Sequence, residues 1–119
     1  MKSEKLLEAL EFHDDVPYAQ PLLVDQYSRI LRFMLKPGQE VKAHQVPTSP
    51  FYVVILKGRG IFTDGKGEEG EYGPNDMLIF DKDEKHSVRA LNEELIFIGF
   101  LHGVETMRPN RTGGELGRK

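Results

Sequence analysis

The sequence contains no cysteine, no long apolar run and no cluster of Lys and Arg, and each absence excludes a class of protein. Without cysteine there is no disulfide scaffold, no thiolate zinc site and no cysteine nucleophile. The longest apolar stretches, 51–56 and 95–101, are far too short to span a bilayer. The 16 Lys and Arg against 19 Asp and Glu give a net charge of -3. We therefore expect no membrane partner and no nucleic-acid partner.

The N-terminus also lacks the apolar core of an export signal, because acidic residues interrupt it. Together with the missing cysteines, this favours a cytoplasmic location. The 119 residues give room for one domain. The 12 Gly and 7 Pro separate short apolar segments, which is typical of a β protein.

The pattern along the chain predicts one short helix followed by eight or nine strands. Ser3 is a suitable N-cap, and Leu6, Leu7 and Leu10 form one apolar stripe, so a helix is expected over 3–11. Strands are expected over 27–36, 41–46, 51–57, 61–63, 68–72, 76–80, 86–91 and 94–101. The expected parts are an N-terminal helix and extended arm (1–21), a β domain (22–103) and a mobile C-terminal tail (104–119).

No long helical pattern separates the strands, so an antiparallel barrel or jelly roll is expected. Two histidines, His44 and His86, lie at strand ends beside turns. A rolled antiparallel sheet can bring such positions together in its interior. Neutral imidazole nitrogens are common ligands for iron, nickel, copper and zinc.

Two stretches resemble the motifs of the cupin superfamily. The first runs from Gly38 through His44 to Gly58, and the second from Asn75 to His86. The resemblance covers about residues 22–101. It implies an all-β double-stranded β-helix, a jelly-roll barrel with a polar site at its centre, usually paired into a homodimer. It also implies a metal held by three histidines and one glutamate.

The sequence departs from that ligand set at two positions. Val46 stands at the position of the second histidine, and Phe51 at that of the glutamate. Only His44 and His86 remain, so a divalent metal (Fe, Mn, Ni or Zn) would bind weakly, with water or ligand oxygens completing its shell. His102, at the end of the last apolar strand, is one candidate for a replacement ligand. The pair could equally be hydrogen-bonded interior histidines, or serve in acid–base chemistry without metal.

A ligand pocket is expected around the two histidines. Phe51, Val53 and Ile55 share one face of the strand over 51–57, and with Val46 they would line an apolar pocket. Ordinary core packing is the alternative for these residues. Arg32, alone among apolar neighbours, is a candidate anchor for a carboxylate or phosphate, the alternative being a place on the solvated face.

The sequence thus favours a small-molecule-binding cupin with a weak divalent-metal site at His44 and His86. The alternative from another class is a metal-dependent dioxygenase or isomerase acting on a small organic substrate. A structural or regulatory subunit without a small ligand is a third possibility. No catalytic residue can be assigned from the sequence, and cupin-like folds host many activities.

Overall fold

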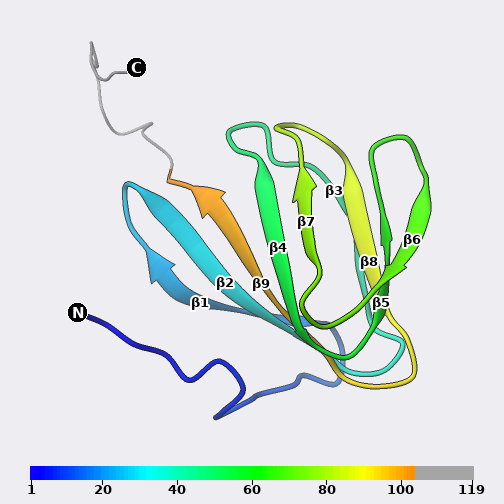
Figure 1. Cartoon of the computed structure of the whole chain (residues 1–119), viewed down its shortest axis with the longest axis horizontal. Coiled ribbons are helices and arrows are strands. Elements are labelled where there is room, and N and C mark those ends of the chain that lie inside the picture. Colours follow the sequence, from blue (N-terminus) through cyan, green and yellow to red (C-terminus); the bar gives the residue numbers. More distant parts are fainter. Residues whose placement is uncertain (104–119) are drawn as a thin grey trace.

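The computed structural model of the protein describes residues 1–103, which contain nine β-strands. They are β1 (Tyr18–Val24), β2 (Ser28–Leu35), β3 (Glu40–His44), β4 (Phe51–Lys57), β5 (Gly60–Thr63), β6 (Glu69–Tyr72), β7 (Met77–Phe80), β8 (His86–Ala90) and β9 (Leu95–His102). The strands form a five-stranded sheet in the order β1-β2-β9-β4-β7 and a four-stranded sheet in the order β3-β8-β5-β6 (Figure 1). The predicted all-β jelly roll is confirmed. The expected closed barrel is not found, because the described strands make two separate sheets.

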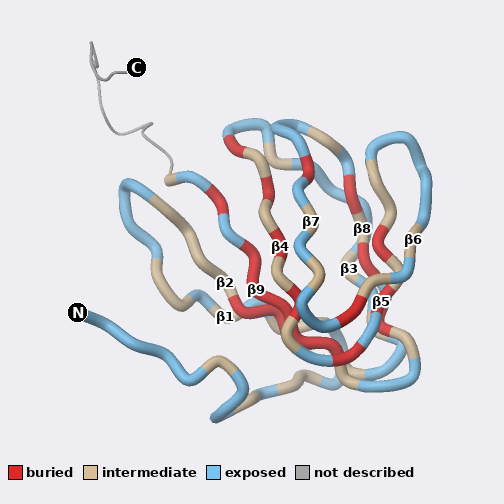
Figure 2. Tube along the Cα trace, viewed as in Figure 1, coloured by how far each residue is buried: buried red, intermediate tan, exposed pale blue. Residues whose placement is uncertain are grey.

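The core lies between the two sheets and follows from the alternation of side chains along each strand. In β4, Phe51, Val53 and Ile55 are buried, whereas the residues between them are half-buried (Figure 2). The inward positions of the other strands complete one apolar cluster. Its remaining buried members are Phe33, Leu35, Phe62, Phe80, Val88, Ala90, Leu95, Phe97 and Leu101. Hydrophobic burial between the sheets therefore holds the sandwich together.

Strand β9 is buried on both faces over most of its length. Its outward residues Ile96 and Ile98 are paired in register with Met34 and Arg32 of β2. The N-terminal segment reaches this outer face, since the backbone amide of Glu11 donates to the Met34 sulfur at 3.3 Å. The segment before β1 therefore covers part of the outer surface of the five-stranded sheet.

The predicted N-terminal helix over 3–11 is wrong, because the described residues contain no helix. Three backbone carbonyls of this segment instead accept hydrogen bonds from the buried guanidinium of Arg32. Its Nη1 donates to Leu6 O at 3.1 Å and to Glu8 O at 3.0 Å, and its Nη2 donates to Ala9 O at 3.3 Å. A nine-residue helix is marginal on its own. A charged donor that satisfies three carbonyls therefore overrides the local helical pattern.

The first strand begins before residue 22, the predicted start of the β domain. Strand β1 begins at Tyr18, inside the expected N-terminal arm, and carries Pro21. It is an edge strand of its sheet, where the missing amide proton of a proline is tolerated. The mobile tail expected over 104–119 lies outside the described residues. No helix among the described residues is long and apolar enough to cross a membrane.

The interior is closely packed where Gly99 of β9 faces Phe51 and Phe33. A Cβ atom on Gly99 would lie 2.5 Å from Cε1 of Phe51 and 2.9 Å from Cε1 of Phe33. The two phenylalanine rings meet edge to face, with centroids 6.0 Å apart. The missing side chain of Gly99 therefore provides the room that these two rings occupy.

Substitution of Gly99 by Ala is expected to lower the free energy of unfolding by about 1–3 kcal/mol, because the added methyl group overpacks the rings. Chemical denaturation measures the change. In a Phe51→Leu background the same substitution should cost clearly less, since the smaller side chain leaves room. Equal costs in the two backgrounds would show that the Phe51 ring does not impose the requirement for glycine.

Replacement of Arg32 by Met retains an unbranched apolar stem but removes every guanidinium donor. We expect residues 1–17 to detach, with faster amide exchange there and a loss of about 2 kcal/mol in unfolding free energy. The control is Arg89→Met, which removes an exposed arginine from β8. Unchanged exchange over residues 1–17 in the Arg32 variant would refute the clamping role of Arg32.

Candidate functional site

The pairing of β3 with β8 brings the two predicted histidines together. His44 ends β3, His86 begins β8, and the two residues are direct partners in the antiparallel register. Their ring centroids lie 4.3 Å apart with the ring planes at 62°. The sequence prediction that these two residues meet is therefore correct in geometry.

Both imidazoles are oriented by backbone carbonyls two residues earlier in the chain. His44 Nδ1 donates to Lys42 O at 3.0 Å, and His86 Nδ1 donates to Glu84 O at 3.0 Å. A carbonyl oxygen only accepts hydrogen bonds, so each Nδ1 must carry the proton. In the neutral form each Nε2 then presents a lone pair, which is the state in which imidazole binds a metal.

His86 lies in an aromatic environment, with 5% of its surface exposed. Its ring stacks on Phe80 with centroids 4.6 Å apart and on Phe51 with centroids 4.9 Å apart. Its Nε2 is buried and has no hydrogen-bond partner among the described residues. Burial is the main cause that holds the pKa of His86 below its ordinary value, and nearby His44 adds to it.

The space at the pair is small. A cavity of about 10 Å³ lies between the two histidines and a group of aromatic side chains, which is room for about one water molecule. Five phenylalanines line it, namely Phe33, Phe51, Phe62, Phe80 and Phe97. His44 itself is exposed, so the pair is closed on its inner side and open to solvent on the other.

The donor set fits a metal in type but not in number. Within residues 1–103, three or more His, Asp or Glu side chains nowhere gather in a way that could hold a metal ion. His102 does not supply the missing ligand, because its Nε2 lies 3.2 Å from the Tyr52 hydroxyl, on the outer face of the five-stranded sheet. Two imidazole nitrogens could thus hold a metal only if solvent or ligand atoms completed its shell.

The five residues expected to line a ligand pocket separate in the structure. Phe51 alone among them lines the cavity at the histidines. Val53 and Ile55 are fully buried core residues, and Val46 packs against the core from its edge. Arg32 is 4% exposed and lies under the N-terminal segment, on the face of β2 opposite the core residue Phe33. Val53 and Ile55 are therefore ordinary core residues, which was the alternative to a role in lining a ligand pocket.

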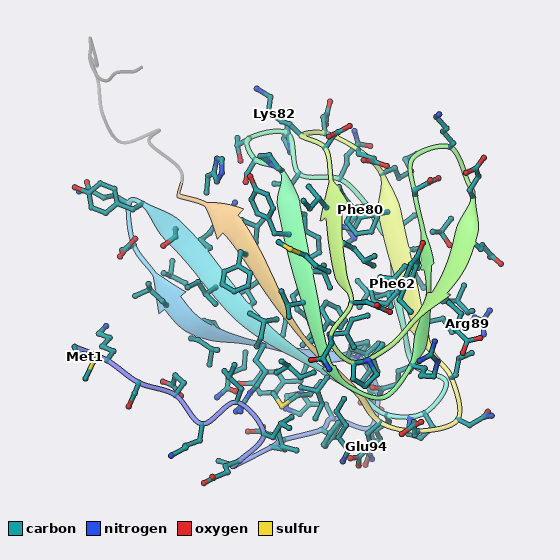
Figure 3. All side chains as sticks on the ribbon, viewed as in Figure 1. Met1, Phe62, Phe80, Lys82, Arg89 and Glu94 are labelled. Atoms are coloured by element: carbon teal, nitrogen blue, oxygen red, sulfur yellow. The ribbon has the colours of Figure 1, made fainter. Side chains whose placement is uncertain are left out.

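A larger cavity of about 270 Å³, not predicted from the sequence, lies beside β6 and β7. Its apolar side chains are those of Phe62, Tyr72, Leu78 and Phe80. The side chains of Phe62 and Phe80 lie between the two sheets (Figure 3). Four carboxylate residues also line it, namely Asp64, Glu68, Glu69 and Glu84. The density of acidic residues over 64–72 was visible in the sequence, but its position against aromatic side chains depends on the sheet order.

The two-sheet architecture and the paired histidines define a jelly roll with a small interior site. The family model of the cupin domain matches residues 31–98, which is more than half of the chain. The protein therefore belongs to the cupin family. No curated protein sequence matches the chain at a significant level.

Solved structures support the same fold. An RmlC-like cupin protein from Desulfovibrio desulfuricans is 25% identical, with a TM-score of 0.76 over 85% of this chain and 96% of that one. An uncharacterized conserved protein with a double-stranded β-helix domain from Klebsiella pneumoniae is 18% identical, with a TM-score of 0.82 over 88% and 92%. A predicted oxalate decarboxylase from Thermotoga maritima is 26% identical, with a TM-score of 0.61 over 66% and 69%.

The low pKa of His86 predicts a loss of stability in mild acid. The unfolded chain takes up a proton near the ordinary pKa of 6.5, whereas folded His86 resists protonation. The free energy of unfolding should therefore fall as the pH drops below about 6.5, by at most about 1.4 kcal/mol per pH unit, and level off below the folded-state pKa.

Chemical denaturation between about pH 7 and about pH 5, with chelator present, measures this dependence. His86→Phe should flatten it, because the titrating group is gone and an aromatic ring remains against Phe51 and Phe80. The control His13→Gln, which removes a histidine from the N-terminal segment, should retain it. An equal pH dependence in wild type and His86→Phe would contradict the assignment.

Proposed function

We propose that the protein is a small-molecule-binding cupin in which His44 and His86 form a weak, solvent-open site for a divalent metal. One observation carries the metal part of the proposal. Both Nδ1 atoms are engaged by backbone carbonyls, and the Nε2 of His86 is buried without a partner. A buried polar atom without a partner is costly, and a metal or a metal-bound water would satisfy it.

Iron, manganese, nickel and zinc all accept imidazole ligands, so the donor type does not select among them. Two protein ligands would leave the rest of a metal's shell to solvent or to atoms of a small molecule, and these would reach the pair from the solvent side, where His44 is exposed. A metal bound there would supply Lewis acidity toward an oxygen atom of a small molecule. The two histidines would hold and orient it, while the surrounding phenylalanines exclude bulk water from its inner side.

The small-molecule part of the proposal is supported by the cavity beside β6 and β7. Its volume of about 270 Å³ lies close to the lower end of typical ligand pockets, about 300 Å³. It combines aromatic and aliphatic walls with several carboxylates, a lining that can both enclose and orient a small ligand. The cavity at the histidines is too small for an organic molecule.

A metal-dependent dioxygenase or isomerase remains the alternative function. The similarity to a protein described as a predicted oxalate decarboxylase is an analogy of fold, and activity depends on the site. A substrate would have to reach the metal from the side of His44, because aromatic rings close the other side. Turnover that disappears in His44→Ala and His86→Ala would favour the enzyme over the binding protein.

A homodimer is also proposed. Met77, Ile79 and Phe100 are 59%, 59% and 37% exposed, and they lie on the outer face of the five-stranded sheet next to Tyr52 and Val54. An uncharged apolar surface of this kind favours a second copy of the same surface. The cytoplasmic location is proposed from the absence of cysteine in the sequence.

Equilibrium dialysis against Zn²⁺ or Mn²⁺, followed by metal analysis, tests the metal site. Wild type should bind up to one metal per chain with weak affinity, and the His44→Ala/His86→Ala variant should bind none. The matched control is His13→Ala/His102→Ala, which removes two histidines away from the pair. Binding that is unchanged in the first variant, or lost in the control, would rule out the pair as the metal site.

A further inference from the structure

Two arginines of β2 lie three residues apart, on opposite faces of the strand. Arg32 faces outward, and its guanidinium donates two hydrogen bonds to Gln20 Oε1 and three to backbone carbonyls of the N-terminal segment. A guanidinium has five N–H donors, so every donor of Arg32 is engaged. Arg32, the residue predicted to anchor an anion, therefore has no donor left for one.

The guanidinium of Arg29 is in the opposite state. Its Nε and Nη2 atoms are buried and have no hydrogen-bond partner among the described residues. These two atoms form one edge of the guanidinium, and their parallel N–H bonds match the two oxygens of a carboxylate. A buried charged donor without an acceptor is costly. The Nε–Nη2 edge of Arg29 thus lacks the acceptor that its burial calls for.

Register and alternation place Arg29 at the border between the core and solvent. It lies on the same face of β2 as the core residues Phe33 and Leu35, and on one side it pairs with buried Leu101 of β9. On its other side it pairs with Val24 of β1, which is 60% exposed. Arg29 itself is half-buried. Its side chain is therefore covered from the side of β9 and approachable from the side of β1.

The inner face of β1 is open to solvent. Its residues on that face are Ala19, Pro21 and Val24, and all three are exposed. Figure 1 shows the β1–β2 hairpin extending away from the four-stranded sheet. A small molecule can therefore reach Arg29 along β1 and lay an apolar body against these three residues. A rotation of the flexible arginine stem turns the Nε–Nη2 edge toward such a molecule.

The charge of Arg29 is not neutralised by the hairpin that carries it. No ion pair between described residues includes Arg29. The nearest carboxylate along the hairpin is that of Asp25, which accepts the backbone amides of Tyr27 and Ser28 and so stabilises the turn. A planar monoanionic carboxylate would satisfy two parallel donors and one positive charge. Phosphate would bring a second charge and further oxygens for which Arg29 offers no partner.

We propose that Arg29 anchors the carboxylate of a small organic acid through its Nε–Nη2 edge, with the apolar part of the acid against the inner face of β1. The proposal rests on the proposed small-molecule binding, for which it names a class of ligand, and it requires no metal at His44 and His86. It gives Arg29 the role that the sequence predicts for Arg32.

Three small probes test the class of ligand. They are butyrate, its neutral analogue butyramide, and inorganic phosphate, each titrated into the full chain at constant ionic strength. We expect butyrate to bind more tightly than either of the others and to shift the side-chain Nε–H signal of Arg29 in NMR spectra, since that proton enters a charge-assisted hydrogen bond. The signal is assigned by its absence in Arg29→Met.

Variants of Arg29 test the assigned side chain. Arg29→Met should weaken butyrate at least about tenfold, and Arg29→Lys, which keeps the charge without the paired donors, should weaken it about fivefold. The matched control is Arg89→Met, which removes an exposed arginine from β8 and should leave butyrate binding unchanged.

A second measurement needs no ligand. In the absence of butyrate, Arg29→Met should raise the melting temperature by about 4 °C, because the variant no longer buries an unpaired charge. Butyrate should then raise the melting temperature of wild type and of Arg89→Met, but not that of Arg29→Met. A lower melting temperature of the ligand-free Arg29→Met chain would show that the guanidinium is already satisfied within the protein, which overturns the proposal.

The other outcomes separate this inference from the proposed function. If butyrate binds equally to wild type and Arg29→Met, or is weakened equally by Arg89→Met, small acids bind without Arg29 and its assigned role fails. If butyramide or phosphate binds as tightly as butyrate, the class of ligand is wrong. If no probe binds to a chain that circular dichroism shows to be folded, the anchor fails. Small fragments that perturb only β6 and β7 would still support the proposed small-molecule binding.

Discussion

The ring of Phe51 determines how the interior around the two histidines is packed. Its ring stacks on His86, meets Phe33 edge to face and occupies the space that Gly99 leaves open. A carboxylate at this position would ligate a metal in the motif that the sequence resembles. The aromatic ring of Phe51 instead helps to exclude water from His86, and this burial lowers the pKa of the histidine. The same side chain thus removes a ligand, buries a histidine and closes the space beside it.

Much of this could be predicted from the sequence because the relevant patterns are local or carried by a motif. The alternation in β2, the apolar run of β4 and the turns around them predicted the strands closely. The meeting of His44 and His86 followed from the motif spacing. Strand β4 is apolar along almost its whole length, yet its outer residues are half-buried, and β9 is the strand buried on both faces.

The remaining features depend on contacts between distant segments. The leucine pattern over 3–11 predicted a helix, but the partner that decides its conformation is Arg32, more than twenty residues later. The same hydrogen bonds explain why Arg32 is buried under the N-terminal segment. The sequence predicts Arg32 in a ligand pocket around the two histidines, but it does not line the cavity there. The cavity beside β6 and β7 exists only because these consecutive strands belong to different sheets. No periodicity within either strand contains that information.

The two cavities share a wall, which ties the chemistry of the histidines to that of the larger space. Phe62 and Phe80 line both cavities, and Phe80 stacks directly on His86. A ligand against Phe80 in the larger cavity would therefore touch the same ring that encloses the histidine. A second link runs through Glu84, which also lines the larger cavity and whose backbone carbonyl accepts the hydrogen bond from His86 Nδ1. A molecule bound in the larger cavity would therefore couple to the protonation or ligation of His86 through Phe80 and Glu84.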